Sequence, residues 1–128
     1  MPTIAAVNDP AIGAGCDLAL MCDIRIASTK ARFGETFLNL DIIPGDGGAW
    51  FLPRIVGYQR AAETIFSGRI VDAEEAKQIG LVLKVVERDK LLEMSHRLSA
   101  EIAAKPLAAL RMANSRIRLR SAMTSRSN

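Results

Sequence analysis

The chain has 128 residues, which is enough for one domain with a hydrophobic core and too short to expect two. Its hydrophobic share of 49% and charged share of 24% are ordinary for a globular protein, and its formal net charge is only +3. No apolar run reaches the length of a membrane helix, so we expect no membrane partner. Two cysteines are too few for a disulfide framework or a zinc site, which favours the reducing cytoplasm and predicts no metal.

The first part of the chain predicts short strands that alternate with a helix. Residues 3–7 form an apolar run typical of a buried strand, and the small residues that begin 13–21 open an apolar helix. Polar and apolar residues alternate over 23–28, which predicts a strand with one face toward water. Another short extended piece is expected at 32–34.

The middle of the chain contains its densest turn signal, at 42–48, followed by a helix expected over 49–56. Pro53 predicts a kink or a break in that helix, because proline has no backbone N–H to donate. Trp50 and Phe51 are expected to fill the core.

The remaining elements are predicted from their end signals. Gly68 is expected to cap a helix over 59–66, and Asp72 with Glu75 predicts a capping box at the start of the next helix. The other expected elements are a helix over 73–79, a strand over 81–86, and helices over 89–105 and 107–119.

Strands that alternate with helices favour the α/β class. We divide the chain into a core at 1–106 and a C-terminal helix with a basic tail at 107–128. The arginines of that tail have no acidic residue among them. A basic tail is able to bind phosphates, including nucleic acid, but no aromatic residues are interleaved for base stacking. A solvated or frayed terminus is therefore the favoured interpretation, and a nucleotide-phosphate binder is the weaker one.

The Gly13-Ala14-Gly15-Cys16-Asp17 element is the strongest local signal for chemistry. Small residues between a strand and a helix let the backbone approach a ligand, and the helix N-terminus favours an oxyanion. A dinucleotide fingerprint needs glycine or alanine at its sixth position, where this chain has Leu18. A tight turn without ligand is the simpler alternative.

A series of motifs resembles the crotonase (enoyl-CoA hydratase/isomerase) family in both order and spacing, from Pro2 to about Pro106. The matching stretches are PTIAAVN (2–8), AIGAGCDLA (11–19), MCD (21–23), FG (33–34), IPGDGG (43–48), PR (53–54), VG (56–57), GR (68–69) and the A, A, G, L, V positions within 73–82. The resemblance implies part of a spiral of strand-strand-helix turns, followed by C-terminal helices. It also implies a trimer or hexamer that binds acyl-CoA thioesters, with coenzyme A as part of the substrate and no separate cofactor.

The resemblance further implies roles for particular residues. The N–H of Ala14, between Gly13 and Gly15, corresponds to one of two oxyanion donors, and the other belongs to sequence upstream of Met1. The first of the family's two catalytic glutamates falls on Asp17. The alternative for Asp17 is a structural role near the helix start.

The second catalytic glutamate of the family falls on Phe37, which neither holds a water nor moves a proton. Glu35 lies nearby with a side chain expected to point elsewhere, so Asp46 is the better substitute. The turn that contains Pro44 and Gly45 borders the acyl pocket in this family. The resemblance thus implies substrate-binding roles for Gly13, Gly15, Phe37, Pro44 and Gly45. Asp46 has the alternative role of capping the following helix.

The resulting hypothesis is an acyl-CoA enzyme that stabilises a thioester enolate. The loss of the second glutamate shifts the expected reaction from hydration toward isomerisation or hydrolysis. The alternative is a truncated, non-catalytic fragment that binds coenzyme A weakly or only joins oligomers.

Overall fold

The computed structural model describes residues 2–35 and 46–127. Strands β1 (Ile4–Val7), β3 (Ile24–Ser28) and β6 (Lys84–Val86) form a parallel sheet in the order β1-β3-β6. Ile4 lies opposite Ile24, and Ile26 lies opposite Lys84. Parallel neighbours require crossover connections, and helix α1 (Ala14–Met21) lies on the connection from β1 to β3.

A second small sheet has the order β2-β4-β5. Strand β2 (Ala11–Ile12) is parallel to β4 (Arg32–Gly34), and β4 is antiparallel to β5 (Val71–Asp72). The helices of the second half are α2 (Asp46–Val56), α3 (Tyr58–Ser67), α4 (Ala73–Gln78), the 3-10 helix η2 (Arg88–Lys90), α5 (Leu91–Ala103) and α6 (Leu107–Ser127). The mixture of strands and helices confirms the predicted α/β class.

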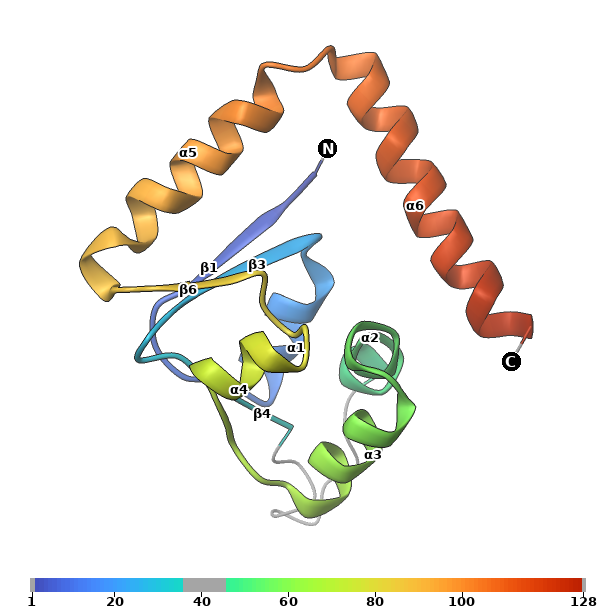
Figure 1. Cartoon of the computed structure of the whole chain (residues 1–128). Helices are drawn as coiled ribbons and strands as arrows, with labels where there is room; N and C mark the ends of the chain where they lie inside the picture. The colour runs from blue at the N-terminus through green and yellow to red at the C-terminus, as the bar shows by residue number, and fades with distance from the viewer. Residues whose placement is uncertain (1, 36–45, 128) are drawn as a thin grey trace.

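Figure 1 shows α5 on one side of the β1-β3-β6 sheet and α1 with α4 on the other. The main core lies on the side of α1, where Cys16 and Leu20 pack with Val7 and Ala27. On the other side of the sheet Leu91 of α5 is also buried. Burial on both faces is the usual condition of a parallel sheet.

The predicted wet face of the second strand is wrong. Arg25 and Ser28 of β3 are both buried, as are Ile26 and Ala27. These polar side chains are buried because they have backbone partners. The Ser28 hydroxyl donates to the Asn8 carbonyl oxygen at 2.6 Å, and the Arg25 guanidinium donates to four carbonyls.

Helix α2 begins at Asp46, three residues earlier than expected, and runs through Pro53 without a break. Leu52 and Val56 on either side of Pro53 are buried, so core packing holds both turns of the helix in place. Trp50 is exposed rather than in the core, with the Arg54 guanidinium carbon 3.3 Å from its ring centroid.

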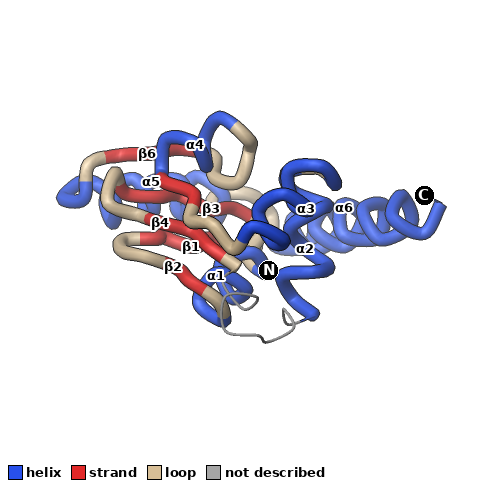
Figure 2. Tube along the Cα trace, turned by 90° about the horizontal axis from the view of Figure 1, so that it is seen from below, coloured by secondary structure: helices blue, strands red, loops and turns tan. Residues whose placement is uncertain are grey.

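Two strand and helix ends also differ from expectation. Strand β6 begins only at Lys84, because the N–H groups of Leu81 and Val82 bond to the Ala76 carbonyl and close helix α4. Helix α6 extends to Ser127, well past the predicted end. Figures 1 and 2 show α6 projecting from the body. The Asn114 amide of this helix donates a hydrogen bond to the Asp23 carboxylate at 3.1 Å.

Candidate functional site

The junction between β2 and α1 is built on Gly13. Its φ of 59° and ψ of −120° lie in a region that favours glycine. The Gly13 N–H donates to the Gly34 carbonyl at 2.8 Å, and the Gly13 carbonyl accepts from the Asp17 N–H at 3.0 Å. These two bonds fix the first turn of α1 against the end of β4.

Ala14 is the first residue of α1, so its N–H has no acceptor within the helix. The positive end of the helix dipole lies at the same place and favours a negative charge. A Cβ added at Gly15 meets no heavy atom within 4 Å, so the adjacent position borders open space. The predicted oxyanion donor thus lies at a helix N-terminus, with Asp17 in the same first turn.

The other end of α1 is held by Arg25. Its guanidinium donates to the carbonyls of Ala19, Leu20 and Cys22 at 3.3, 3.4 and 2.7 Å, and to that of Leu81 at 2.7 Å. The last carbonyls of a helix have no intrahelical partner, and a cation there also opposes the helix dipole. Burial lowers the pKa of Arg25. Arg25 thereby ties α1 to β3 and to the segment after α4.

A cluster of three ionisable side chains lies beneath the first turn of α1. Asp17 and Cys16 come from α1, and Glu35 follows directly after β4. Glu35 is fully buried, and Cys16 is nearly so. Asp17 Oδ1 and both carboxyl oxygens of Glu35 are buried without a conventional donor among the described residues.

The carboxyl groups of Asp17 and Glu35 are close enough to share a hydrogen bond when one of them is protonated. Burial raises the pKa of Glu35 to about 8, and the hydrogen bond to Asp17 and its negative charge act in the same direction. Burial, together with the nearby Glu35, raises the pKa of the Cys16 thiol to about 12. At neutral pH Glu35 and Cys16 are therefore both uncharged.

Of the other predicted site residues, the structure describes only Asp46. Asp46 is the first residue of α2, and α2 packs against α1. Phe37, Pro44 and Gly45 lie outside the described residues, so their predicted contacts with an acyl group stay predictions. Sequence reasoning assigned no role to Glu35, although a glutamate directly after the Phe33-Gly34 strand end was the available signal.

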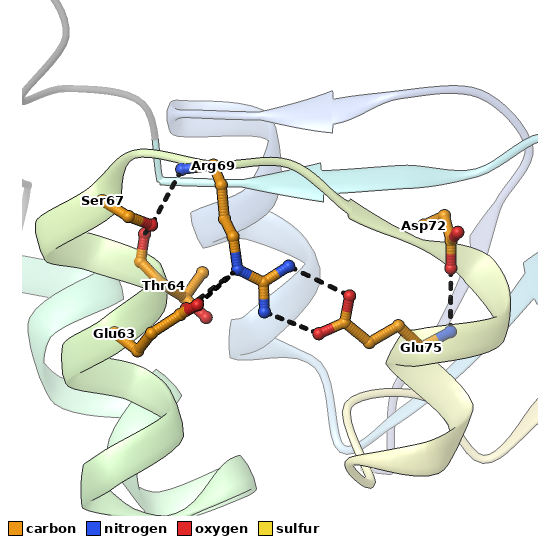
Figure 3. Close-up of polar contacts among 6 residues, drawn as sticks. All are labelled: Glu63, Thr64, Ser67, Arg69, Asp72 and Glu75. Carbon is orange, nitrogen blue, oxygen red and sulfur yellow. Dashed lines mark hydrogen bonds and ion pairs between the residues drawn. The ribbon is translucent and has the colours of Figure 1, made fainter.

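A second charged cluster joins α3 to α4 and lies at the surface. Figure 3 shows the Arg69 guanidinium between Glu63 and Glu75, with N–O distances of 2.7 Å and 2.6 Å. The predicted capping box is only half correct. Asp72 accepts from the Glu75 N–H at 2.9 Å, but the Glu75 side chain binds Arg69 instead of returning to Asp72.

The Arg69 cluster borders a groove of about 620 Å³ that is also lined by Tyr58 and Arg60. The charged residues that line the groove are Arg60, Arg69, Glu63 and Glu75, so their formal charges cancel and the groove carries no excess positive charge for an anion. Among the described residues, no group of His, Cys, Asp and Glu side chains has the arrangement of a metal site. Within 2–35 and 46–127 no helix is both long enough and apolar enough to cross a membrane.

Comparison with known proteins agrees with the fold and the motifs. The enoyl-CoA hydratase/isomerase family model matches residues 1–127. A short-chain-enoyl-CoA hydratase of Clostridioides difficile is 49% identical over 116 residues, which cover 91% of this chain and 74% of that protein.

Two crystal structures share the fold. The enoyl-CoA hydratase of Bacillus anthracis has a TM-score of 0.90 and 44% identity, and 92% of this chain covers 46% of it. A monofunctional enoyl CoA isomerase of Mycobacterium smegmatis has a TM-score of 0.85 and 36% identity, with 94% of this chain covering 57% of it. The chain thus spans about half the length of these two proteins. A family model matched over nearly every residue, and a fold shared with a hydratase and an isomerase, establish that the chain belongs to the crotonase (enoyl-CoA hydratase/isomerase) family.

Proposed function

We propose that this chain binds an acyl-CoA thioester and promotes a reaction through its enolate. The observation that supports this most is the first turn of α1. This turn contains the Ala14 N–H, which has no acceptor within the helix. It also contains Asp17, three residues later, whose side chain is partly exposed. The N–H is able to stabilise a developing oxyanion, and the carboxyl is able to accept and return a proton.

In the proposed step, the Asp17 carboxylate removes a proton from a carbon conjugated with the thioester carbonyl. The electron pair of the broken C–H bond moves into the carbonyl, which becomes an enolate whose oxygen accepts from the Ala14 N–H. Return of the proton to another carbon completes an isomerisation. A donor of this kind lowers the barrier by about 3 to 4 kcal/mol, because it acts where charge develops.

Asp46 is the proposed second acid or base. It is the first residue of α2, and α2 packs against α1. Hydration in this family requires a second glutamate at the position of Phe37. The proposed reaction is therefore isomerisation or another enolate reaction in preference to hydration.

The test is a calorimetric titration of the chain with acetoacetyl-CoA, whose acyl group resembles the enolate. We expect saturable binding that is changed by Asp17→Asn. Asp89→Asn, at an exposed aspartate of η2, removes the same charge as a matched control and should bind as the original chain does. No binding at millimolar ligand would reject an acyl-CoA site in this chain and favour the non-catalytic alternative.

We also propose that the chain forms a homo-oligomer, a trimer or a dimer of trimers. Helix α6 projects from the body and exposes Leu107, Met112 and Ile117. Exposed apolar side chains in one element support self-association. Sedimentation velocity is the measurement, and a monomer at every concentration tested would contradict the proposal.

The proposed compartment is the cytoplasm. Cys16 and Cys22 are both free thiols, as expected of a protein in a reducing environment. Fractionation of cells that produce the tagged protein would test this assignment, and recovery outside the cytoplasmic fraction would reject it.

A further inference from the structure

Glu35 has a backbone position that leaves its side chain little freedom. It follows Gly34, whose carbonyl accepts the Gly13 N–H and so holds the end of β4 against the start of α1. The exposed fraction of Glu35 is 0%. The side chain is thus directed under the first turn of the helix that carries the proposed oxyanion donor.

The surroundings of Glu35 offer almost no solvation. The adjoining cavity measures about 10 Å³, which is at the lower limit for a single water. Apart from Cys16 and residues of β4, it is lined by Leu52, Val56, Thr64, Val71, Ile79 and Leu81. None of these six side chains ionises, so the titratable groups that face Glu35 among the described residues are Asp17 and Cys16.

Two adjacent carboxylates under these conditions are strongly unfavourable. An ionised carboxyl whose only donor among the described residues is the weak Cys16 S–H is strongly disfavoured in an apolar site, and a second negative charge beside it adds repulsion. One proton removes both problems, since a neutral carboxyl donates through its hydroxyl while the other accepts. The protonated partner is expected to be Glu35, because it is fully buried whereas Asp17 is partly exposed.

We propose that Glu35 is a positioning residue for Asp17: its neutral carboxyl donates a hydrogen bond to the Asp17 carboxylate and orients that group as the base. This inference rests on the proposed function only for the role of Asp17 as a base. The pairing itself concerns the protein without ligand. It gives the site a carboxyl pair from α1 and from the residue after β4, in addition to any contribution from Asp46.

The pairing has a consequence for ligand binding. When Glu35 loses its proton, the pair gains a second negative charge close to the place where the enolate charge is held. Enolate binding must then weaken as pH rises through the titration of Glu35, by up to tenfold per pH unit for one linked proton. A glutamine at this position keeps an N–H donor and removes the titration.

The first experiment is a pH titration of the full chain with carboxyl carbons labelled with ¹³C and followed by NMR, in which Glu35→Gln assigns the Glu35 signal. We expect Glu35 to be protonated at neutral pH and to titrate at lower pH in Asp17→Asn. An ionised Glu35 at neutral pH would overturn the proposal. An unshifted titration in Asp17→Asn would also overturn it, because burial alone would then account for the proton. If Glu35→Gln does not fold, sequential assignment of the unsubstituted chain gives the same signal.

The second experiment measures acetoacetyl-CoA affinity against pH for the original chain and for Glu35→Gln. We expect the alkaline loss of affinity in the original chain and no such loss in Glu35→Gln over the same range. Equal slopes in the two proteins would overturn the link between Glu35 and the base. If neither protein binds the ligand, the proposed function fails, while the NMR titration still decides the pairing.

Discussion

The interior beneath α1 and the surface between α3 and α4 contain the same types of charged residue. The pKa of a glutamate is raised in the interior and lowered at the surface. At the surface, Glu75 lies beside the Arg69 guanidinium, whose hydrogen bonds lower the pKa of that carboxyl. In the interior, Glu35 has no cation bonded to it among the described residues, and burial raises its pKa. The local partner and the access to water decide the charge of a glutamate, whatever its helix or strand.

The pKa values of the surface Arg69 and the buried Arg25 also shift in opposite directions. Carboxylates raise the pKa of Arg69, whereas burial among backbone carbonyls lowers that of Arg25. The surface cluster contributes modest stability between two helices. Interior side chains lie at both ends of α1, with Arg25 at its C-terminus and the Asp17–Glu35 pair at its first turn. Changes in the interior should therefore have larger effects than changes at the surface.

The largest effect is expected for Arg25→Met, which removes the buried clamp of α1. The change leaves the carbonyls of Leu20, Cys22 and Leu81 without their guanidinium donor, and each unsatisfied buried group costs about 1 to 3 kcal/mol. We expect the free energy of unfolding to fall by about 3 kcal/mol in urea denaturation at neutral pH. Arg25→Lys keeps the charge but not the fork of donors, and should recover only part of the loss. A loss below about 1 kcal/mol for Arg25→Met would show that water replaces the guanidinium.

The second effect is the pH dependence of stability that Glu35 produces. Its pKa is raised from 4.5 to about 8 on folding, so between these values the unfolded chain releases a proton that the folded chain keeps. The contribution of Glu35 to stability is therefore complete below pH 4.5 and is lost as pH rises toward 8. The limiting slope is about 1.4 kcal/mol per pH unit for one proton.

Chemical denaturation across this pH range is the measurement for Glu35. Glu35→Gln should remove the slope, because glutamine does not titrate. Glu101→Gln, at an exposed glutamate of α5, removes one negative charge without touching the pair and serves as the matched control. A slope that persists in Glu35→Gln would assign it to other groups and would weaken the contrast between the two regions.

Much of the fold was predictable because its signals are local. The small residues at 13–15, the left-handed Gly68 and the Asp72 cap each place a helix end within one or two residues. The wet face predicted for β3 was wrong because alternation of polar residues does not show where their partners are. The partners of Arg25 come from α1 and from Leu81, 56 residues later in the chain.

For the candidate site, only the positions of the predicted residues are comparable with the structure, and their roles stay predictions. The Ala14 and Asp17 assignments came from motif resemblance, and the structure places both in one helical turn. The Asp17–Glu35 pair was not predicted, because it depends on the Gly13–Gly34 backbone bond that brings the end of β4 beside α1. A contact between separate segments leaves no periodic pattern in the sequence.

The third effect is expected for Arg69→Met at the surface cluster. The side chains of Arg69 and Glu75 are 38% and 34% exposed, so water screens the pair. We expect a loss of about 1 kcal/mol at neutral pH, with a bidentate bond at the upper end of what exposed pairs contribute. The pKa of Glu75 is lowered by Arg69, so this stability is present above pH 4.5 and is lost as pH falls through the lowered pKa.

Denaturation of Arg69→Met and of the original chain, at low and high salt, is the measurement for this pair. The difference between the two proteins should shrink at high salt, because ions screen an exposed pair. A difference that does not depend on salt would mean that Arg69 acts by packing between α3 and α4, and the surface cluster would then resemble the interior one.

The smallest effect is expected for Asp72→Ala, which removes the helix cap beside the Arg69 cluster. The Asp72 carboxylate accepts from the Glu75 N–H at 2.9 Å, and loss of such a cap costs about 1 kcal/mol or less in an exposed helix start. Asp72→Asn keeps an oxygen acceptor but not the charge, and should lose only a few tenths of a kcal/mol. Because the same N–H belongs to Glu75, a double variant with Arg69→Met tests whether the cap and the ion pair are coupled. Additive losses would mean that the surface cluster consists of independent contacts, whereas a combined loss smaller than the sum of the single losses would mean that the cap orients Glu75 toward Arg69.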